Sequence, residues 1–160
     1  MRLKRTNNNG ELRLTDKGKE AVLSGWVHRR RDHGGLIFVD LRDRWGLTQV
    51  VFDPVRDPDA HKAAENIRSE WVISVHGQVN KRTEGMTNPN LPTGEIEVDC
   101  DEIEVLSEAE TVPFPLDEYR EVNEEIRLKY RYLDLRREEM QQNIIFRSKV
   151  ASVTRNYLLE

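Results

Sequence analysis

The residues with the clearest chemical potential lie between Gly25 and Pro54, where a phenylalanine stands among charged side chains. The segment LIFVDLR (36–42) alternates as a half-buried strand does, and one face of it holds three apolar residues: Ile37, Val39 and Leu41. Phe38 falls on the opposite face with Asp40. An aromatic ring on a polar strand face can stack on an unpaired base, which is worth about 1–3 kcal/mol. The same ring can equally be covered by a loop or by a neighbouring domain.

Positive charge is concentrated near this stretch. The net charge of the whole chain is −4, which by itself argues against a nucleic-acid-binding protein. Residues 1–50, however, hold eleven lysines and arginines against six acidic residues, whereas residues 51–160 hold fourteen against twenty-three. The run Arg29-Arg30-Arg31 lies within the positive part. A local surface facing phosphates requires this kind of distribution.

The elements around Phe38 are short strands joined by tight turns. After a polar lead-in (1–20) that we expect to be lightly ordered, residues 21–31 form a first strand, with Gly25 marking a bend or bulge. Turns follow at 32–35 and 43–46, and a third strand runs over 47–53. Asp57-Pro58 then has the residue types of a helix start, and the apolar spacing predicts one short helix ending near Ile67.

Two more alternating segments complete the pattern, at residues 71–82 and 95–105, separated by a Gly/Asn/Pro-rich loop at 83–93. The alternation changes phase near Asp101, which predicts a bulge there. Five strands with a helix between the third and fourth predict a five-stranded OB-fold barrel over residues 21–106, an all-β class of fold with one short helix. Such barrels bind oligonucleotides on strands 2 and 3, which here carry Phe38 and Gln49.

The remainder of the chain differs in character. Residues 107–137 are predicted to be a linker or hinge, and residues 138–160 an amphipathic helix that has no C-terminal glycine cap. The uncapped helix indicates a fragment of a longer protein. The single cysteine, Cys100, excludes an intrachain disulfide and fits a reducing compartment. Without a membrane-length apolar run or a signal-like N-terminus, we expect a cytoplasmic protein that does not bind membranes. The four histidines lack metal-binding spacing, so no catalytic residue or metal site is predicted.

Three segments together resemble bacterial aspartyl-tRNA synthetases: GWVHRRRDHGGLIFVDLRDRWGLTQVVFDP (25–54), TGEIEV (93–98) and RLKYRYLDLRR (127–137). The resemblance runs from about Gly10 to the end of the chain, and RYLDLRR is its more specific part. It implies that the barrel binds the tRNA anticodon. It also implies that RYLDLRR lies in a hinge and that the helix at 138–160 begins class II motif 1, which builds a homodimer interface.

These enzymes are aminoacyl-tRNA ligases that attach L-aspartate to tRNA(Asp) with ATP and Mg through an aspartyl-adenylate. In the family, the ATP and aspartate site lies in later segments that this sequence does not include. The resemblance therefore implies that the 160 residues alone catalyse nothing and hold no cofactor, and we expect them to be mostly monomeric.

The resemblance implies an anticodon-binding role for six residues: Arg29, Arg31, Phe38, Gln49, Arg82 and Glu97. Phe38 is expected to stack on the central uracil, and Gln49 has an amide that can read a base edge. Arg31 can bind a base or a phosphate, whereas Arg29 and Arg30 are expected to hold the backbone.

Two further residues of this set are expected at the edge of the site. Glu97 can accept a hydrogen bond from a base amino group, and Arg82 is expected to reach the first or third anticodon base. For every arginine named, a solvated surface charge is the alternative interpretation.

Two positions depart from the members of the family that are strict for aspartate tRNA. Those enzymes tend to have leucine where this chain has His33, and asparagine is commoner where it has Gly85. Both features resemble the non-discriminating type, which also aspartylates tRNA(Asn). Because the two tRNAs differ in the third anticodon base, a less restrictive pocket at that base would accept both.

Three other functions remain open at this stage. The chain could be a stand-alone OB-fold module for single-stranded nucleic acid, with weak sequence preference. It could belong to a lysine- or asparagine-type synthetase of the same subgroup. It could also be a barrel that binds proteins, in which case Phe38 would be dispensable for RNA binding.

Overall fold

The structure, a computed structural model, describes residues 2–116 and 121–159. It divides into two compact units, Met1–Thr111 and Val112–Glu160. The first unit is a β-barrel and the second is helical. No helix within the described ranges has both the length and the apolar character that a lipid bilayer requires of a spanning segment.

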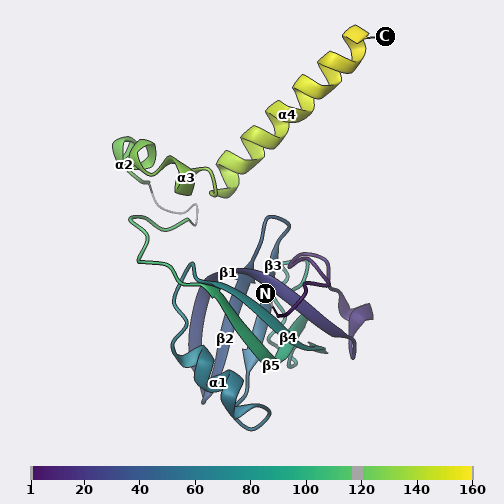
Figure 1. The fold of residues 1–160 in the computed structure, drawn as a ribbon. Coiled ribbons are helices and arrows are strands. Elements are labelled where there is room, and N and C mark those ends of the chain that lie inside the picture. The colour runs from purple at the N-terminus through teal and green to yellow at the C-terminus, as the bar shows by residue number, and fades with distance from the viewer. Residues whose placement is uncertain (1, 117–120, 160) are drawn as a thin grey trace. The chain divides into compact units, whose positions relative to one another are not determined.

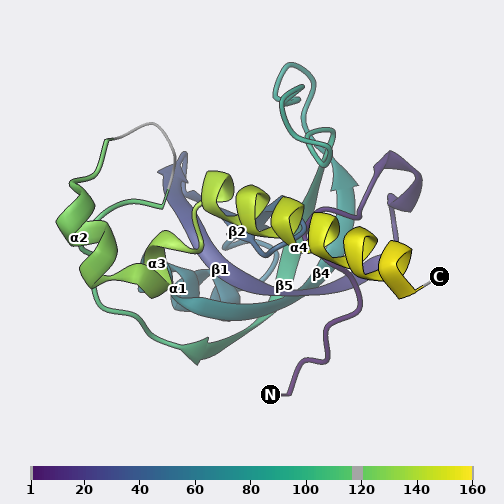
Figure 2. The same cartoon turned by 90° about the horizontal axis from the view of Figure 1, so that it is seen from above.

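Five strands close the first unit into a barrel (Figure 1): β1 (Glu20–His33), β2 (Leu36–Arg42), β3 (Leu47–Phe52), β4 (Val72–Lys81) and β5 (Ile96–Ser107). Their order around the barrel is β1-β2-β3-β5-β4, and β4 pairs back with β1. Neighbouring strands are antiparallel except β3 and β5, which are parallel. The loop at residues 82–95, between β4 and β5, extends away from the barrel wall (Figure 2). The prediction of a five-stranded OB-fold barrel is confirmed.

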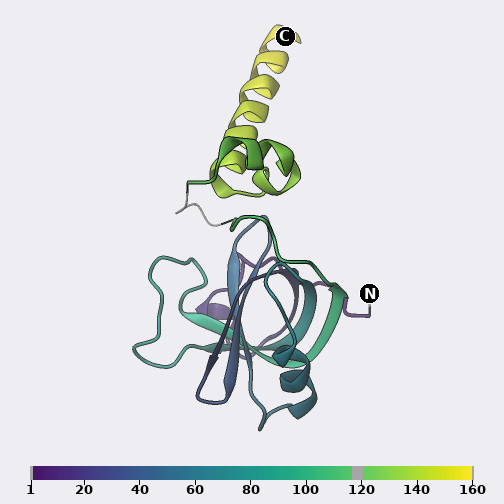
Figure 3. The same ribbon diagram turned by 90° about the vertical axis from the view of Figure 1, so that its left-hand side faces the viewer.

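The barrel core is built from the alternate residues of each strand. Figure 3 looks nearly along the barrel, and its strands enclose a ring. The core cluster of buried side chains in the barrel is apolar. The fully buried ones include Val27, Ile37, Val39, Leu41, Val50, Phe52, Ile73, Val75, Val79, Ile96 and Val98. Cys100 is also buried, as expected of a small residue inside a strand, and desolvation raises the pKa of its thiol. It is therefore a packing residue and not a nucleophile.

A short helix, α1 (Pro58–Glu65), packs against β2, β3 and β5. The carboxylate of Asp57 caps it by accepting a hydrogen bond from the Ala60 backbone N–H at 2.7 Å. Proline occupies the first turn, where no backbone donor is needed. Ala60 and Ala64 are buried and join the barrel core with Ile67. The predicted helix start is confirmed, and the helix ends two residues earlier than its apolar spacing suggested.

Irregularities in the barrel fall at one predicted place, in β5, and at two unexpected places, one in β1 and one between β4 and β5, where the register shifts between Val72 and Ile73. His76 pairs with Glu102 and the next residue, Gly77, pairs with Cys100, so Asp101 is the extra residue of the predicted bulge in β5. In β1 the register shifts between Val27 and Arg29, so the expectation of a bulge at Gly25 is wrong. Gly25 is needed for another reason, since a Cβ atom there would lie 2.3 Å from the carbonyl oxygen of Arg42.

The tight reversal between β1 and β2 is made by a pair of glycines. Gly34 and Gly35 have φ angles of 62° and 84°, a conformation that residues with a Cβ atom rarely adopt. A two-residue turn of this kind matches the twist of the flanking strands. The glycine pair therefore forms the turn that the sequence predicted.

The first twenty residues contribute more to the barrel than a lightly ordered lead-in would. Leu3 and Leu12 are buried, and Leu12 belongs to the barrel core. The backbone N–H of Thr6 donates to the carbonyl of Val22 at 2.9 Å, and a short 3-10 helix, η1, spans Leu14–Asp16. The segment is thus fixed along β1 by both packing and hydrogen bonds.

The second unit contains α2 (Glu124–Lys129), α3 (Arg131–Asp134) and α4 (Glu138–Leu159). Its small apolar cluster consists of Phe114, Leu116 and Leu133, with Val112, Val122 and Tyr130 packed against it. Part of the segment predicted as a linker is therefore structured, while its residues 117–120 lie outside the described part. A helix is confirmed at 138 as α4, but the prediction that it is amphipathic is wrong, because its apolar residues are not concentrated on one face; none of its described side chains is buried.

Candidate nucleic-acid interface

The candidate site lies on the outward side of the barrel wall formed by β1, β2, β3 and β5. On β2, Ile37 and Val39 are fully buried, whereas Phe38 between them is half-buried and outside the core cluster. The expectation that this ring stays out of the barrel interior is confirmed. Its partners in the sheet are Arg31 on β1 and Val51 on β3.

A chain of polar contacts runs across four strands on this wall. One Nη atom of Arg31 lies 2.6 Å from the Asp40 carboxylate and 3.4 Å from the side-chain oxygen of Gln49. The amide nitrogen of Gln49 donates to Glu97 at 2.8 Å. β1, β2, β3 and β5 each contribute one of these residues. Three of the predicted site residues are therefore brought together, and each holds the side chain of the next in place.

Asp40 belongs to this chain of polar contacts, although the sequence did not lead us to assign it to the site. Strand alternation placed it on the face of Phe38, which was the available signal. Its role depends on cross-strand register, because Asp40 pairs with Gln49 on one side and with Arg29 on the other. From there its carboxylate orients the guanidinium of Arg31.

Arg82 lies at the edge of the same charge cluster but is not a solvated side chain. It follows the last residue of β4 and is only 6% exposed. Its Nε donates to the Ile96 carbonyl at 2.9 Å, while one Nη has no hydrogen-bond partner among the described residues. Desolvation lowers the pKa of Arg82, against the opposing attraction of Glu97 and Asp40. A buried cation with an unused donor can bind an incoming acceptor strongly.

Glu97 is half-buried beside this cation. Desolvation raises the pKa of its carboxyl group, a nearby Asp99 adds to the rise, and the hydrogen bond from Gln49 together with the charge of Arg82 offsets only part of it. The neighbouring Asp99 is itself occupied by the Asn80 amide at 2.7 Å. When ionised, the Glu97 carboxylate is only partly compensated by the protein, and a donor supplied by a ligand would stabilise its charge further.

The other predicted residues lie apart from this chain of contacts. Arg29 is exposed on β1, and its side chain makes no hydrogen bond or ion pair among the described residues. Arg30, expected to hold a nucleic-acid backbone, instead donates through Nε to the Ala64 carbonyl of α1 at 3.0 Å. His33 is exposed at the end of β1. Gly85 is exposed in the 82–95 loop with a φ of 84°, and a Cβ atom there would meet nothing within 4 Å.

Taken together, the wall offers a ring for stacking, a planar cation, an amide and a carboxylate within one connected surface. This combination suits unpaired bases, whose faces stack and whose edges are read by hydrogen bonds. It defines the class of protein as an OB-fold nucleic-acid-binding domain. The family model of the OB-fold nucleic acid binding domain matches residues 21–106, more than half of the chain, and the chain belongs to this family.

The second unit matches another family. Residues 123–160 match the family described as class II tRNA synthetases (D, K and N). The chain is 58% identical over 156 residues to the Aspartate--tRNA(Asp/Asn) ligase of Rubrobacter xylanophilus, covering 98% of this chain and 26% of that protein. It is 59% identical over 155 residues to the ligase of the same name from Geotalea uraniireducens, covering 97% and 26%. The chain thus spans about a quarter of the length of these relatives.

Solved structures agree with this relationship. The crystal structure of asparaginyl-tRNA synthetase from Pyrococcus horikoshii, complexed with asparaginyl-adenylate, aligns with a TM-score of 0.79 at 25% identity. The alignment covers 98% of this chain and 34% of that one. The resemblance to bacterial aspartyl-tRNA synthetases, inferred from the three sequence segments, is confirmed by the identity to the two ligases.

Proposed function

We propose that this chain is the anticodon-recognition portion of an aspartate–tRNA ligase that acts on tRNA(Asp) and tRNA(Asn). The observation that carries the proposal is the half-buried Phe38 beside the connected side chains of Arg31, Gln49 and Glu97 on an OB barrel. The identity of 58% to an Aspartate--tRNA(Asp/Asn) ligase supports the choice of RNA. The full-length enzyme would be a cytoplasmic homodimer that uses ATP and Mg to form aspartyl-adenylate.

In this proposal the wall reads the bases through groups that are already oriented. Phe38 stacks on the central uracil, and Gln49 reads a base edge with its amide. Both polar atoms of that amide are engaged, with Arg31 and with Glu97, so RNA must replace or share one of these hydrogen bonds. A side chain held in one rotamer loses little entropy on binding, which favours recognition by a pre-formed site.

The remaining groups supply charge. Arg82 has an Nη donor without a partner among the described residues, but this atom is buried, so the adjoining 82–95 loop would have to shift before the donor could bind an acceptor on a base. Glu97 accepts from a base amino group. Arg29, exposed beside the wall, holds a phosphate and so fixes position without specifying sequence.

Binding of the 160-residue chain to anticodon stem-loops tests the proposal. We expect Phe38→Ala to weaken binding by about 1–3 kcal/mol because it removes one base-stacking contact. Phe146→Ala is the matched control, since Phe146 is an exposed ring of the helical unit. Equal binding of wild type and Phe38→Ala, with the barrel still folded by circular dichroism, would contradict the proposal. Equal binding to any pyrimidine-rich strand would instead favour the stand-alone single-strand module.

The acceptance of both tRNAs is proposed to depend on His33 and Gly85. Each is exposed, and the open space around Gly85 leaves the third anticodon base unconstrained by a side chain from that position. We expect the double variant His33→Leu, Gly85→Asn to bind a stem-loop whose third anticodon base is C in preference to one whose third anticodon base is U, and to increase this preference severalfold over the wild type. Asparagine tolerates the positive φ at residue 85 better than most residues, so the double variant should fold. An unchanged C-to-U affinity ratio would remove this assignment.

A further inference from the structure

A second exposed aromatic ring occupies the turn between β2 and β3, outside the wall described above. Trp45 is 57% exposed, although it is the largest side chain of the turn. The guanidinium carbon of Arg5 lies 5.0 Å from the centroid of the Trp45 ring, and that of Arg44 lies 5.2 Å from it. Two cations thus accompany an indole that remains open to solvent.

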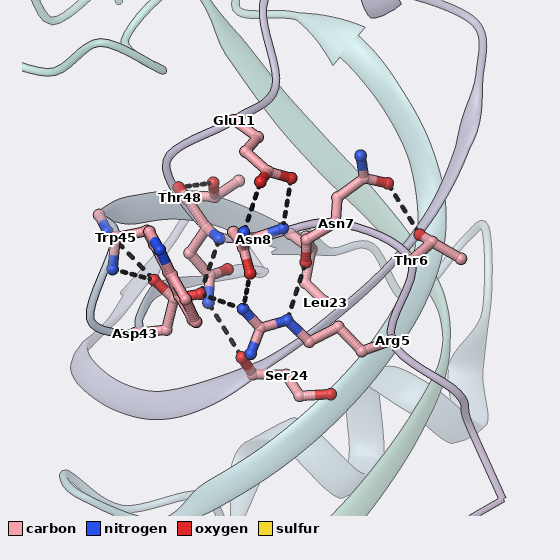
Figure 4. A network of polar contacts seen from close by, with 12 residues as sticks. Arg5, Thr6, Asn7, Asn8, Glu11, Leu23, Ser24, Asp43, Trp45 and Thr48 are labelled. Atoms are coloured by element: carbon pink, nitrogen blue, oxygen red, sulfur yellow. Dashed lines mark hydrogen bonds and ion pairs between the residues drawn. The ribbon is translucent and has the colours of Figure 1, made fainter.

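The turn that carries the indole is held rigidly by a buried carboxylate. Asp43, whose side chain is 4% exposed, accepts from the backbone N–H of Trp45 at 2.7 Å and from that of Gly46 at 3.1 Å. The same carboxylate accepts from the Asn9 backbone and pairs with Arg5 at 2.8 Å. Figure 4 shows Arg5 reaching from the N-terminal segment to Asp43 beside Trp45.

This network explains the position of Arg5 but not the exposure of the indole. The N-terminal segment is already fixed, because Asn9 donates to Ser24 and accepts from Thr48. Arg44 makes no ion pair with a carboxylate of the described residues, and its guanidinium lies over the Trp45 ring. The fold therefore holds an aromatic face and an unneutralised cation at a defined place on the surface. Aromatic and cationic side chains of this kind form stacking platforms for single-stranded nucleic acid.

The turn joins β2 and β3, two strands of the proposed RNA-reading wall. Trp45 lies in the turn four residues before Gln49 of β3, and four residues of extended chain span at most roughly 13 Å. The hydroxyl of Thr93, at the base of the 82–95 loop, donates to the Leu47 carbonyl. The turn and the loop therefore lie at the same end of the barrel.

We infer that Trp45, with Arg44 and Arg5, is a second RNA-binding subsite. It takes one unpaired nucleotide that flanks the anticodon triplet, stacking its base on the indole and pairing the adjoining phosphate with Arg44. This inference rests on the proposed function, because the register of the RNA is set by the contact with Phe38. A few nucleotides of single strand span the distance between the two rings.

Anticodon stem-loops with single abasic positions on either side of the triplet test the subsite. We expect Trp45→Ala to weaken binding of the intact stem-loop about tenfold. An abasic site at one flanking position should lower the affinity of the wild type by a similar factor and should leave the affinity of Trp45→Ala unchanged. Trp45→Phe keeps a ring and should retain most of the affinity. Val55→Ala, at another highly exposed apolar residue, is the matched control.

Two results overturn the subsite while leaving the proposed function intact. In the first, Trp45→Ala binds as the wild type does although Phe38→Ala binds weakly. In the second, Trp45→Ala loses the same amount of affinity for every abasic stem-loop. The second result would mean that the indole acts only by supporting the turn. If Phe38→Ala also binds normally, the proposed function itself fails.

Discussion

Two carboxylates differ in how far the protein compensates their charge: Asp134 in the helical unit is fully paired, whereas Glu97 on the barrel is not. Asp134 is completely buried. It pairs with Arg127 at 2.8 Å, with Arg131 at 2.6 Å and with Arg137 at 3.6 Å. Burial alone would raise the pKa of Asp134, but the hydrogen bond from Arg127 and the charges of the three arginines lower it. Its negative charge is fully used within the protein.

Glu97 shows the reverse balance. Desolvation raises its pKa, and the partners that it has, Gln49 and Arg82, do not restore the usual value. Arg82 correspondingly retains an Nη with no partner among the described residues. A charge cluster whose members are all paired within the protein stabilises the fold. A cluster whose charges are only partly paired can still bind a ligand through the remaining groups. The comparison therefore separates two groups of charged residues that look alike in sequence.

The largest effect is expected at Asp134. Asp134→Ala leaves three guanidinium groups without their shared partner and should lower the free energy of unfolding of the helical unit by about 2–4 kcal/mol. Arg131 stays 47% exposed, so solvent compensates part of the loss. Hydrogen exchange of the α2 and α3 amides measures the change. Glu125→Ala, at an exposed residue of α2, is the control, and equal exchange in the two variants would contradict the structural role.

The pH dependence of the same unit follows from the lowered pKa of Asp134. The stabilisation is present above the ordinary aspartate pKa and is lost as the pH falls through the lower value of the folded state. In Asp134→Ala this acid-induced loss should be absent. If the variant and the wild type lose protection in parallel below that range, the arginine cluster does not stabilise the unit.

The architecture of the barrel could be read from the sequence because it depends on local patterns. Alternation placed Ile37 and Val39 inside and Phe38 outside, and the residue types at Asp57-Pro58 predicted the start of α1. A change of phase located the bulge at Asp101. Each of these signals is contained within one strand or one turn of helix.

The features that were missed depend on contacts between distant segments. The burial of Arg82 and the pairing of Asp40 with Arg31 require the cross-strand register, which alternation does not supply. Arg30 binds α1 because that helix packs close to the end of β1, which the order of elements alone does not reveal. The anchoring of the N-terminal segment likewise depends on Asp43, thirty-four residues after Asn9.

A smaller effect, with opposite signs for stability and for binding, is expected at Glu97. Because its pKa is raised, the folded chain holds a proton more tightly than the unfolded chain does. The contribution of Glu97 to stability therefore falls as the pH rises from the ordinary glutamate pKa towards the folded value. Glu97→Gln can still accept the hydrogen bond from Gln49 and should remove this fall, so that at neutral pH the free variant is at least as stable as the wild type.

RNA binding should respond in the other direction. Where the Glu97 carboxylate is ionised, Glu97→Gln replaces a charged acceptor by a neutral one and should weaken binding of the anticodon stem-loop by about 1–2 kcal/mol. Thermal unfolding and binding measured on the same samples give both quantities, with Glu95→Gln, at an exposed glutamate two residues earlier, as the control. If Glu97 served structure alone, as Asp134 does, neutralising it would lower the stability of the protein instead of preserving or raising it. If Glu97→Gln lowers stability and leaves binding unchanged, the contrast between the two carboxylates is wrong and Glu97 belongs to the framework of the barrel.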